Sequence, residues 1–221
     1  LDGRFLDVPH QLGPDVAIYR VDLPADAIVP PAAVGQVELA RANRMRDREE
    51  ALRFLASHAL LRSVLASALG TSRSQLALTA DALGKPRLAG DPIRFNMSRS
   101  GAALLIGLSR TREIGVDIEL VRDVSIPADL AGTHLAGREF AAWQAEDERA
   151  RDARFLELWT RKEACVKAAG TGLSLPLACI EVGLDCRHAP TSVAFSSGPC
   201  EWKGMVESLA LLPGAFAAAA M

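Results

Sequence analysis

The stretch GVDIE, residues 115–119, says most about how this chain folds. Alternate side chains of a strand point to opposite faces, so Val116 and Ile118 share one face while Asp117 and Glu119 share the other. Asp and Glu are poor strand formers, so two of them on one face of an apolar strand indicate a role beyond solubility. The alternative is an ordinary solvated face of a surface strand.

A second stretch, WTRKEACVK at residues 159–167, is typical of a helix. Trp159, Glu163 and Lys167 are spaced four residues apart and therefore lie along one line of that helix. Because Trp159 marks the apolar side, we expect Glu163 to be at least partly buried, and a buried carboxylate needs a partner. That partner is either Lys167, in an ordinary i, i+4 salt bridge, or a cation shared with the carboxylates of the strand.

A shared cation would be held by three carboxylates, Asp117, Glu119 and Glu163. Oxygen ligands without His or Cys favour Mg²⁺ over zinc. Mg²⁺ commonly completes its shell with water and substrate phosphate, and Lys167 lies one helical turn beyond the last carboxylate. This pattern predicts a site that holds a hard divalent cation against a phosphate.

Two segments before the acidic strand supply candidate phosphate ligands. GKP, residues 84–86, is a turn that presents one ammonium, and FNMSRS, residues 95–100, ends a strand with Ser98 and Arg99. Hydroxyl, guanidinium and backbone N–H groups suit a phosphate dianion. For either segment taken alone, an ordinary polar turn is the simpler interpretation.

Periodicity and turn residues predict an α+β protein. A strand at 15–22 precedes one long helix over residues 32–69, in which Arg53 is the only arginine that we expect to reach inward. Further strands are predicted at 75–79, 93–98, 102–109, 114–121, 179–185, 191–196, 201–208 and 215–221, and further helices at 126–131, 137–147 and 151–169. The order strand, long helix, strands occurs twice, which favours two similar halves, residues 1–112 and 113–221, with a ligand cleft between them.

The composition is that of a globular enzyme, with 49% hydrophobic and 24% charged residues. The net charge of -2 gives no overall attraction to nucleic acid, so any anion site must be local. The 4 cysteines form no CxxC pair, and without a signal peptide we expect free thiols in a reducing cytosol. The longest apolar run, residues 215–221, is too short to cross a bilayer, so no membrane association is expected.

The ordered blocks GKP, FNMSRS, GVDIE and WTRKEACVKAAGTGLSLP resemble the Sfp-type 4′-phosphopantetheinyl transferases. The resemblance covers about residues 53–177, and the order and spacing of the blocks are more specific than any single block. It implies a cytoplasmic, monomeric pseudo-dimer of two α+β halves with coenzyme A in the cleft between them. The implied reaction transfers the phosphopantetheine arm of coenzyme A to a serine of an apo acyl or peptidyl carrier protein and releases adenosine 3′,5′-bisphosphate.

The resemblance also implies a role for each matching residue. Asp117, Glu119 and Glu163 would hold Mg²⁺ against the pyrophosphate, which Lys167 would contact. The 3′-phosphate and nearby nucleotide atoms would be gripped by Arg53, Lys85, Ser98 and Arg99, with the contact shaped by Gly84, Pro86 and Asn96. The family pattern has a histidine where this chain has Arg99, and because Arg is always charged and can bind phosphate in a bidentate fashion, the contact can be kept or strengthened.

The carrier serine has an unperturbed hydroxyl and needs a general base. Glu163, directly or through water, is the first candidate, and Glu139, in GREF at residues 137–140, is the second. Two rival functions remain: a Mg²⁺-dependent coenzyme A pyrophosphohydrolase, and a catalytically silent protein that binds coenzyme A or a carrier. Release of the bisphosphate from coenzyme A alone would indicate hydrolysis, whereas release that requires an apo carrier would indicate transfer.

Overall fold

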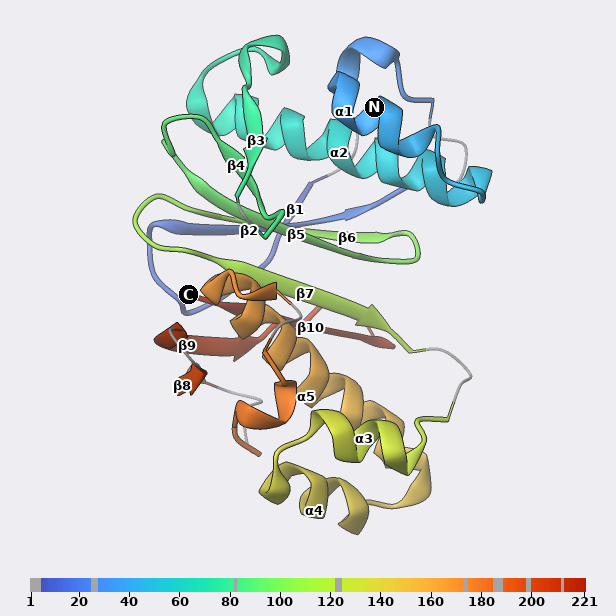
Figure 1. The fold of residues 1–221 in the computed structure, drawn as a ribbon, viewed down its shortest axis with the longest axis vertical. Coiled ribbons are helices and arrows are strands. Elements are labelled where there is room, and N and C mark those ends of the chain that lie inside the picture. Colours follow the sequence, from blue (N-terminus) through green and yellow to red (C-terminus); the bar gives the residue numbers. More distant parts are fainter. Residues whose placement is uncertain are drawn as a thin grey trace.

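In the computed structural model the chain forms four layers, with helices outside and two sheets stacked between them (Figure 1). Side chains from both sheets, among them Ile18, Leu105, Val116 and Ile118, fill the space between the sheets. The fold class predicted from the sequence, α+β, is confirmed. The structure describes residues 5–24, 28–81, 83–121, 125–172, 175–184, 189–197, 200–211 and 213–221.

The first sheet is antiparallel and comes from the N-terminal part of the chain. Its strands lie in the order β1 (Leu6–Asp7), β2 (Val16–Asp22), β6 (Ala103–Ser109) and β5 (Arg94–Ser100). A short hairpin of β3 (Leu78–Ala80) and β4 (Pro86–Leu88) forms a separate two-stranded sheet. The predicted strands at 15–22, 93–98 and 102–109 are confirmed, whereas β1 and β4 have no counterpart among the predictions because two- and three-residue strands carry too few side chains to show an alternation.

The prediction of one long helix over residues 32–69 is wrong. The chain instead forms a 3-10 turn at Pro31–Ala33, α1 (Gln36–Ala42) and α2 (Arg48–Leu69). The carboxylate of Asp47 accepts the backbone N–H groups of Glu49 at 2.8 Å and Glu50 at 3.1 Å. A helix begins where a side chain satisfies its first N–H groups, so Asp47 starts a new helix with its own register.

Helix α2 covers the outer face of the first sheet (Figure 1). By length and composition alone it is the one described helix long and apolar enough to cross a membrane, with a mean hydropathy of 1.2 over a window that is 50% buried. Its side chains Leu60, Leu61 and Leu65 are fully buried and pack with Phe95 and Leu104 of the sheet. A core helix passes the same test of length and hydropathy, and α2 packs as one.

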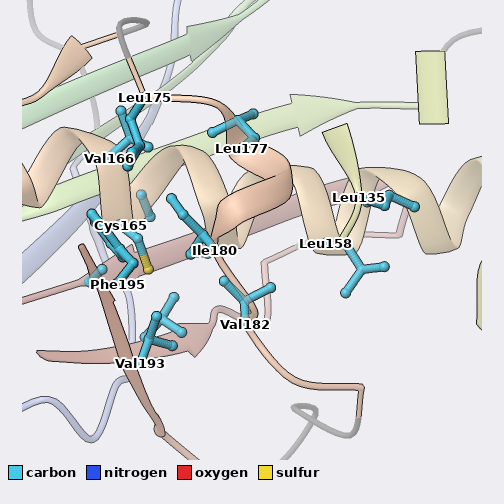
Figure 2. Packing of buried hydrophobic residues seen from close by; sticks show 14 of the residues in the cluster. Leu135, Leu158, Cys165, Val166, Leu175, Leu177, Ile180, Val182, Val193 and Phe195 are labelled. Atoms are coloured by element: carbon cyan, nitrogen blue, oxygen red, sulfur yellow. The ribbon is translucent and has the colours of Figure 1, made fainter. Parts of the chain in front are cut away.

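The second sheet is also antiparallel, in the order β7 (Gly115–Leu120), β10 (Ala215–Ala220), β9 (Cys200–Ser208) and β8 (Thr191–Ser197). Its outer face is covered by α5 (Glu148–Ala169), and the shorter helices α3 (Ala128–His134) and α4 (Gly137–Ala145) lie beside α5 (Figure 1). Figure 2 shows the core of this part, in which Leu158, Cys165 and Val166 of α5 lie against Val193 and Phe195 of β8. The predicted helices and the strands 114–121, 191–196, 201–208 and 215–221 are confirmed within two or three residues at each end.

The prediction of a strand at residues 179–185 is wrong for its described part. Leu177–Cys179 form a 3-10 turn, and residues 180–184 form neither a strand nor a helix, while residue 185 lies outside the described residues. Ile180 and Val182 of this segment are buried beneath α5. Burial of alternate residues produces the same pattern as a strand, which explains the error. The relation of residues 1–112 and 113–221 as similar halves stays a prediction.

Gly115 sets the distance between β7 and α5. A Cβ atom at this position would lie 2.0 Å from the backbone oxygen of Ala164 and 2.4 Å from the backbone nitrogen of Ala168. Both atoms belong to the helix backbone and cannot move aside as a flexible side chain can. Glycine therefore allows α5 to lie directly on the strand that carries Asp117 and Glu119.

Candidate active site

A row of polar side chains joins the edges of the two sheets. On β5, Asn96, Ser98 and Ser100 are alternate residues, so they share one face of the strand, and all three bond to residues of β7. The side-chain oxygen of Asn96 accepts the N–H of Val116 at 2.9 Å. The hydroxyl of Ser98 donates to Oδ1 of Asp117 at 2.7 Å, and the hydroxyl of Ser100 donates to Oε2 of Glu119 at 2.8 Å. These bonds bring the two acidic residues of GVDIE against the FNMSRS segment, as a shared site requires.

Lys167, in the last turn of α5, reaches the same place. Its ammonium donates to Oδ1 of Asp117 at 2.5 Å, to the hydroxyl of Ser98 at 3.1 Å and to the backbone oxygen of Val116 at 3.3 Å. Ser98, Asp117 and Lys167, which lie far apart in the sequence, therefore share one polar cluster. The sequence-based alternative of a plain Glu163–Lys167 salt bridge is not what the structure shows, because the ion pair that Lys167 forms among the described residues is with Asp117.

Glu163 faces this cluster from the preceding turn of α5. Burial is the main cause of a raised pKa at Glu163; the charge of Lys167 opposes the rise, and the charges of Asp117 and Glu119 add to it. Asp117 and Glu119 are therefore close enough to Glu163 for their charges to act on its carboxyl group. Asp117 itself is only 3% exposed.

Two carboxylate oxygens of this cluster are buried without a hydrogen-bond partner among the described residues, Oδ2 of Asp117 and Oε1 of Glu163. Buried polar atoms normally have partners, so an unpaired pair of anionic oxygens facing one cluster fits a ligand that supplies positive charge. Within the described part of the chain no group of three or more His, Cys, Asp or Glu side chains is arranged to hold an ion as it stands. Asp117 instead forms an ion pair with the ammonium of Lys167. The carboxylates of Asp117, Glu119 and Glu163 are oxygen ligands of the kind that Mg²⁺ prefers, and their assignment as metal ligands stays a prediction.

Two cavities flank the β4–β5 region next to this cluster. The first, of about 250 Å³, is lined on its polar side by Arg41, His58, Ser98 and Arg99. The second, of about 230 Å³, lies between the turn before β4 and the C-terminal end of α5, and Lys167 lines it. Both cavities share three lining residues, Gly84, Pro86 and Asn96. A ligand that spans both could contact Arg99 at one end and Lys167 at the other, which is the arrangement expected of a long phosphorylated molecule.

Arg99 and Arg53 lie on the α2 side of the first sheet. Arg99 alternates with Ser98, so its side chain leaves the opposite face of β5, where its Nη2 donates to Oε2 of Glu50 at 2.7 Å. Arg53 pairs with Glu49 and, at 3.3 Å, with Oε1 of Glu50. Arg99 lines the first cavity and Arg53 does not. Arg53 turns to Glu49 and Glu50 in the first turn of its own helix, so the structure does not bring its guanidinium to this cavity.

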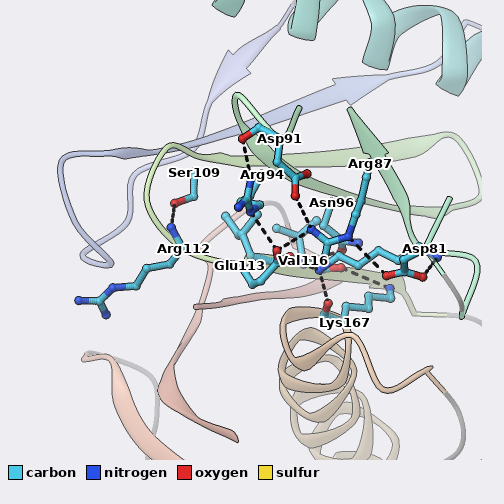
Figure 3. A network of polar contacts seen from close by, with 12 residues as sticks. Asp81, Arg87, Asp91, Arg94, Asn96, Ser109, Arg112, Glu113, Val116 and Lys167 are labelled. Carbon is cyan, nitrogen blue, oxygen red and sulfur yellow. Dashed lines mark hydrogen bonds and ion pairs between the residues drawn. The ribbon is translucent and has the colours of Figure 1, made fainter. Parts of the chain in front are cut away.

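Lys85 is placed differently from its expected role. Its ammonium, on a side chain that is 10% exposed, pairs with Oε2 of Glu113 at 2.8 Å and donates to the backbone oxygen of Lys167 at 2.7 Å. Glu113 also pairs with Arg87 at 2.8 Å and with Arg94 at 3.0 Å, in the network that Figure 3 shows. The structure therefore directs Lys85 to the junction of the sheets and α5, and does not bring its ammonium to the cavity that Arg99 lines.

Glu139 does not join the acidic cluster. It is 1% exposed, and its carboxylate pairs with Nζ of Lys162 at 2.6 Å and accepts the N–H groups of Ala136 at 3.0 Å and Val182 at 2.8 Å. Lys162 in turn donates to the backbone oxygen of Leu177 at 3.0 Å. These contacts tie α4 to α5 and to the segment after α5. Glu139 is thus a buried structural residue, and the prediction that it could serve as the general base is wrong.

Sequence reasoning missed Arg41 and His58 as residues of the first cavity. The guanidinium of Arg41, from α1, lies 5.0 Å from the centre of the Phe54 ring, and the ring of His58 lies 4.3 Å from it. Burial lowers the pKa of His58 to about 4. The spacing Asp47-x-x-Glu50 is a sequence signal for a helix start, and reading it would have separated α1 from α2.

Comparison with known proteins finds one matching family model and several similar sequences. The family model described as the 4′-phosphopantetheinyl transferase superfamily matches residues 113–219. The 4′-phosphopantetheinyl transferase HetI of Nostoc sp. is 34% identical over 180 residues, which cover 78% of this chain and 76% of HetI. A 4′-phosphopantetheinyl transferase of Bacillus subtilis is 31% identical over 171 residues, 76% of this chain and 75% of the relative. The 4′-phosphopantetheinyl transferase Sfp of Bacillus subtilis is 30% identical over 145 residues, 65% of this chain and 63% of Sfp.

Proposed function

Because this chain belongs to the 4′-phosphopantetheinyl transferase superfamily, we propose that it transfers the phosphopantetheine arm of coenzyme A to a serine of an apo carrier protein in a Mg²⁺-dependent reaction. Adenosine 3′,5′-bisphosphate is the other product. The bond between the β-phosphorus and the bridging pyrophosphate oxygen breaks, the serine oxygen takes its place on phosphorus, and the serine proton leaves to a base.

One observation carries this proposal: the polar cluster at the junction of β5, β7 and α5. It combines Asp117, Glu163 and Lys167 with Ser98, and it adjoins a cavity that Lys167 lines. Transfer of a phosphoryl-linked group needs positioning and neutralisation of charge more than covalent chemistry. Anionic oxygens and one ammonium at the end of an elongated cavity suit that task.

The residues of the cluster have separate tasks in this proposal. Lys167 is the direct contact for a pyrophosphate oxygen, and it would exchange its ion pair with Asp117 for that contact. Mg²⁺, held by Asp117, Glu119 and Glu163, would supply neutralisation of the pyrophosphate charge. Ser98 holds Asp117 in place through its hydroxyl, and Arg99 at the far end of the first cavity binds the 3′-phosphate.

Glu163 is the proposed acceptor of the serine proton. Burial raises its pKa above the usual value of 4.5, so its carboxylate binds a proton more readily than an exposed glutamate does. A base must be ionised to act, and the positive charge of Lys167 favours the ionised form. Glu139 has no part in this step because its contacts are with Lys162, Ala136 and Val182.

The test is the intact mass of an apo carrier protein after incubation with this protein, coenzyme A and Mg²⁺. We expect one carrier serine to gain the mass of the phosphopantetheine arm, and adenosine 3′,5′-bisphosphate to appear in equal amount. A parallel incubation without carrier separates the rival function. Bisphosphate release in the absence of a carrier, with no mass gain in its presence, would replace transfer by hydrolysis of coenzyme A.

A further inference from the structure

Among the described residues, the charged partner of Arg99 is Glu50. Nη2 of Arg99 donates to Oε2 of Glu50 at 2.7 Å, while Nη1 donates to the backbone oxygen of Gly101 at 3.0 Å. Oε1 of Glu50 accepts from Nη1 of Arg53 at 3.3 Å. Glu50 thus bridges two arginines, and one of them lines the first cavity.

Glu50 carries a full negative charge at neutral pH. The hydrogen bond from Arg99 lowers the pKa of its carboxyl group, and the charge of Arg99 lowers it further. A carboxylate and a phosphate both accept hydrogen bonds from guanidinium N–H groups and therefore compete for them. In the ligand-free protein this position of Arg99 is therefore already taken by an anion that belongs to the chain.

Competition at Arg99 depends on the charge of the incoming group. A monoanion offers the guanidinium no more charge than Glu50 does, and Glu50 is already in place. A phosphate dianion offers twice the charge and more acceptor oxygens, so it can displace the carboxylate. Neutral groups such as a hydroxyl cannot.

We propose that Glu50 is an internal competitor that holds Arg99 in an ion pair until a phosphate dianion displaces it, and that it thereby sets the affinity for the 3′-phosphate. This inference rests on the proposed function, because coenzyme A is the ligand that brings such a phosphate. Glu50 lies outside the cavity lining and contacts no proposed metal ligand in the described structure. It acts only through the arginine that it occupies.

The test is titration calorimetry of the full chain with coenzyme A and with dephospho-coenzyme A, which lacks the 3′-phosphate. Glu50→Gln keeps a helix-forming side chain of the same shape and removes the charge. We expect it to tighten coenzyme A binding about fivefold, the amount that corresponds to one partly exposed ion pair. Binding of dephospho-coenzyme A should not change, since that ligand does not compete with Glu50.

Two matched variants make the result specific to the Arg99 pair. Glu49→Gln removes the neighbouring charge, which pairs with Arg53 and not with Arg99, and should leave both affinities unchanged. In an Arg99→Ala background, Glu50→Gln should have no further effect on coenzyme A, because the competition no longer exists. Thermal melts of all variants establish that each one is folded.

Several results would overturn the inference. If Glu50→Gln weakened coenzyme A binding, Glu50 would be positioning Arg99 and not competing for it. An unchanged affinity, or an equal gain for both ligands, would also exclude competition at Arg99. If the wild-type protein binds coenzyme A and modifies the carrier, any of these outcomes contradicts only the role of Glu50, and the proposed function stands. If the wild-type protein does not bind coenzyme A, both the role of Glu50 and the proposed function are wrong.

Discussion

His58 lies largely covered in the wall of the first cavity, with its ring 4.3 Å from that of Phe54. Burial lowers its pKa from 6.5 to about 4; the charge of Glu38 opposes the shift, and the charges of Arg41 and Arg62 add to it. Between these two pH values the unfolded chain binds a proton at His58 and the folded chain does not. The free energy of unfolding must therefore fall as the pH falls through this window, and the effect is absent above it.

We expect this single group to reduce the free energy of unfolding by about 2 kcal/mol between pH 7 and pH 5, since one pKa unit corresponds to about 1.4 kcal/mol. Urea unfolding of the wild type and of His58→Gln at both pH values measures it. The variant should lose less stability on acidification than the wild type, whatever its stability at pH 7. Equal losses in the two proteins would mean that His58 titrates normally in the fold.

Gly115 is the residue of β7 that lies against the backbone of α5. A methyl group there would overlap the backbone of α5, so the helix or the strand would have to move. We expect Gly115→Ala to lower the free energy of unfolding by about 1–3 kcal/mol and to reduce transfer activity, because the carboxylates of β7 would shift relative to Glu163.

The control for this substitution is Gly137→Ala at the start of α4, where a Cβ atom meets nothing within 4 Å. Alanine is the better helix former, so Gly137→Ala should be neutral or stabilising by up to about 1 kcal/mol. Thermal and urea unfolding compare the two. A Gly115→Ala protein as stable as the wild type would contradict the close approach of β7 and α5.

Lys85 links three parts of the fold: the turn before β4, the loop before β7 at Glu113 and the last turn of α5. Lys85→Met removes the charge from a largely buried site and frees the backbone oxygen of Lys167. We expect a loss of about 1–3 kcal/mol in stability, since a hydrogen bond to a charged group is broken, and a slower transfer because the Lys167 backbone is held less firmly.

Arg94→Gln is the matched control for Lys85→Met. Arg94 also pairs with Glu113, at 3.0 Å, but its polar contacts among the described residues do not include Lys167. Steady-state kinetics with saturating carrier should show a lower kcat for Lys85→Met than for Arg94→Gln. Equal kcat values in both variants would reduce Lys85 to a purely stabilising role.

Elements with a strong local period could be predicted from the sequence. The alternation in GVDIE placed Val116 and Ile118 in the core between the sheets and Asp117 and Glu119 on the other face, and the structure agrees. The long helix over residues 32–69 could not be read correctly from apolar spacing, because the residues on both sides of the break are helical and the cap at Asp47 marks the start of α2. Local signals of this kind decide where an element starts.

At the scale of the whole molecule, the candidate site depends on which elements become neighbours. Charge and spacing identified Asp117, Glu163 and Lys167 as members of one site, and they lie together. No sequence pattern shows that the ammonium of Lys85 pairs with Glu113 or that Glu50 pairs with Arg99. Each of these ion pairs joins two segments that are distant in the sequence and meet only when the protein folds. Ion pairs of this kind are determined by how the elements pack, and the periodicity of the sequence does not reveal them.

The central claim is that Asp117, Glu119 and Glu163 of one cluster hold Mg²⁺ where coenzyme A places its pyrophosphate. Titration calorimetry of coenzyme A with and without Mg²⁺, on the wild type and on Asp117→Asn, tests it without relying on turnover. We predict that Mg²⁺ tightens coenzyme A binding by the wild type at least about tenfold, which is about 1.4 kcal/mol, and that Asp117→Asn loses this gain. An equal Mg²⁺-dependent gain in Asp117→Asn would contradict the account.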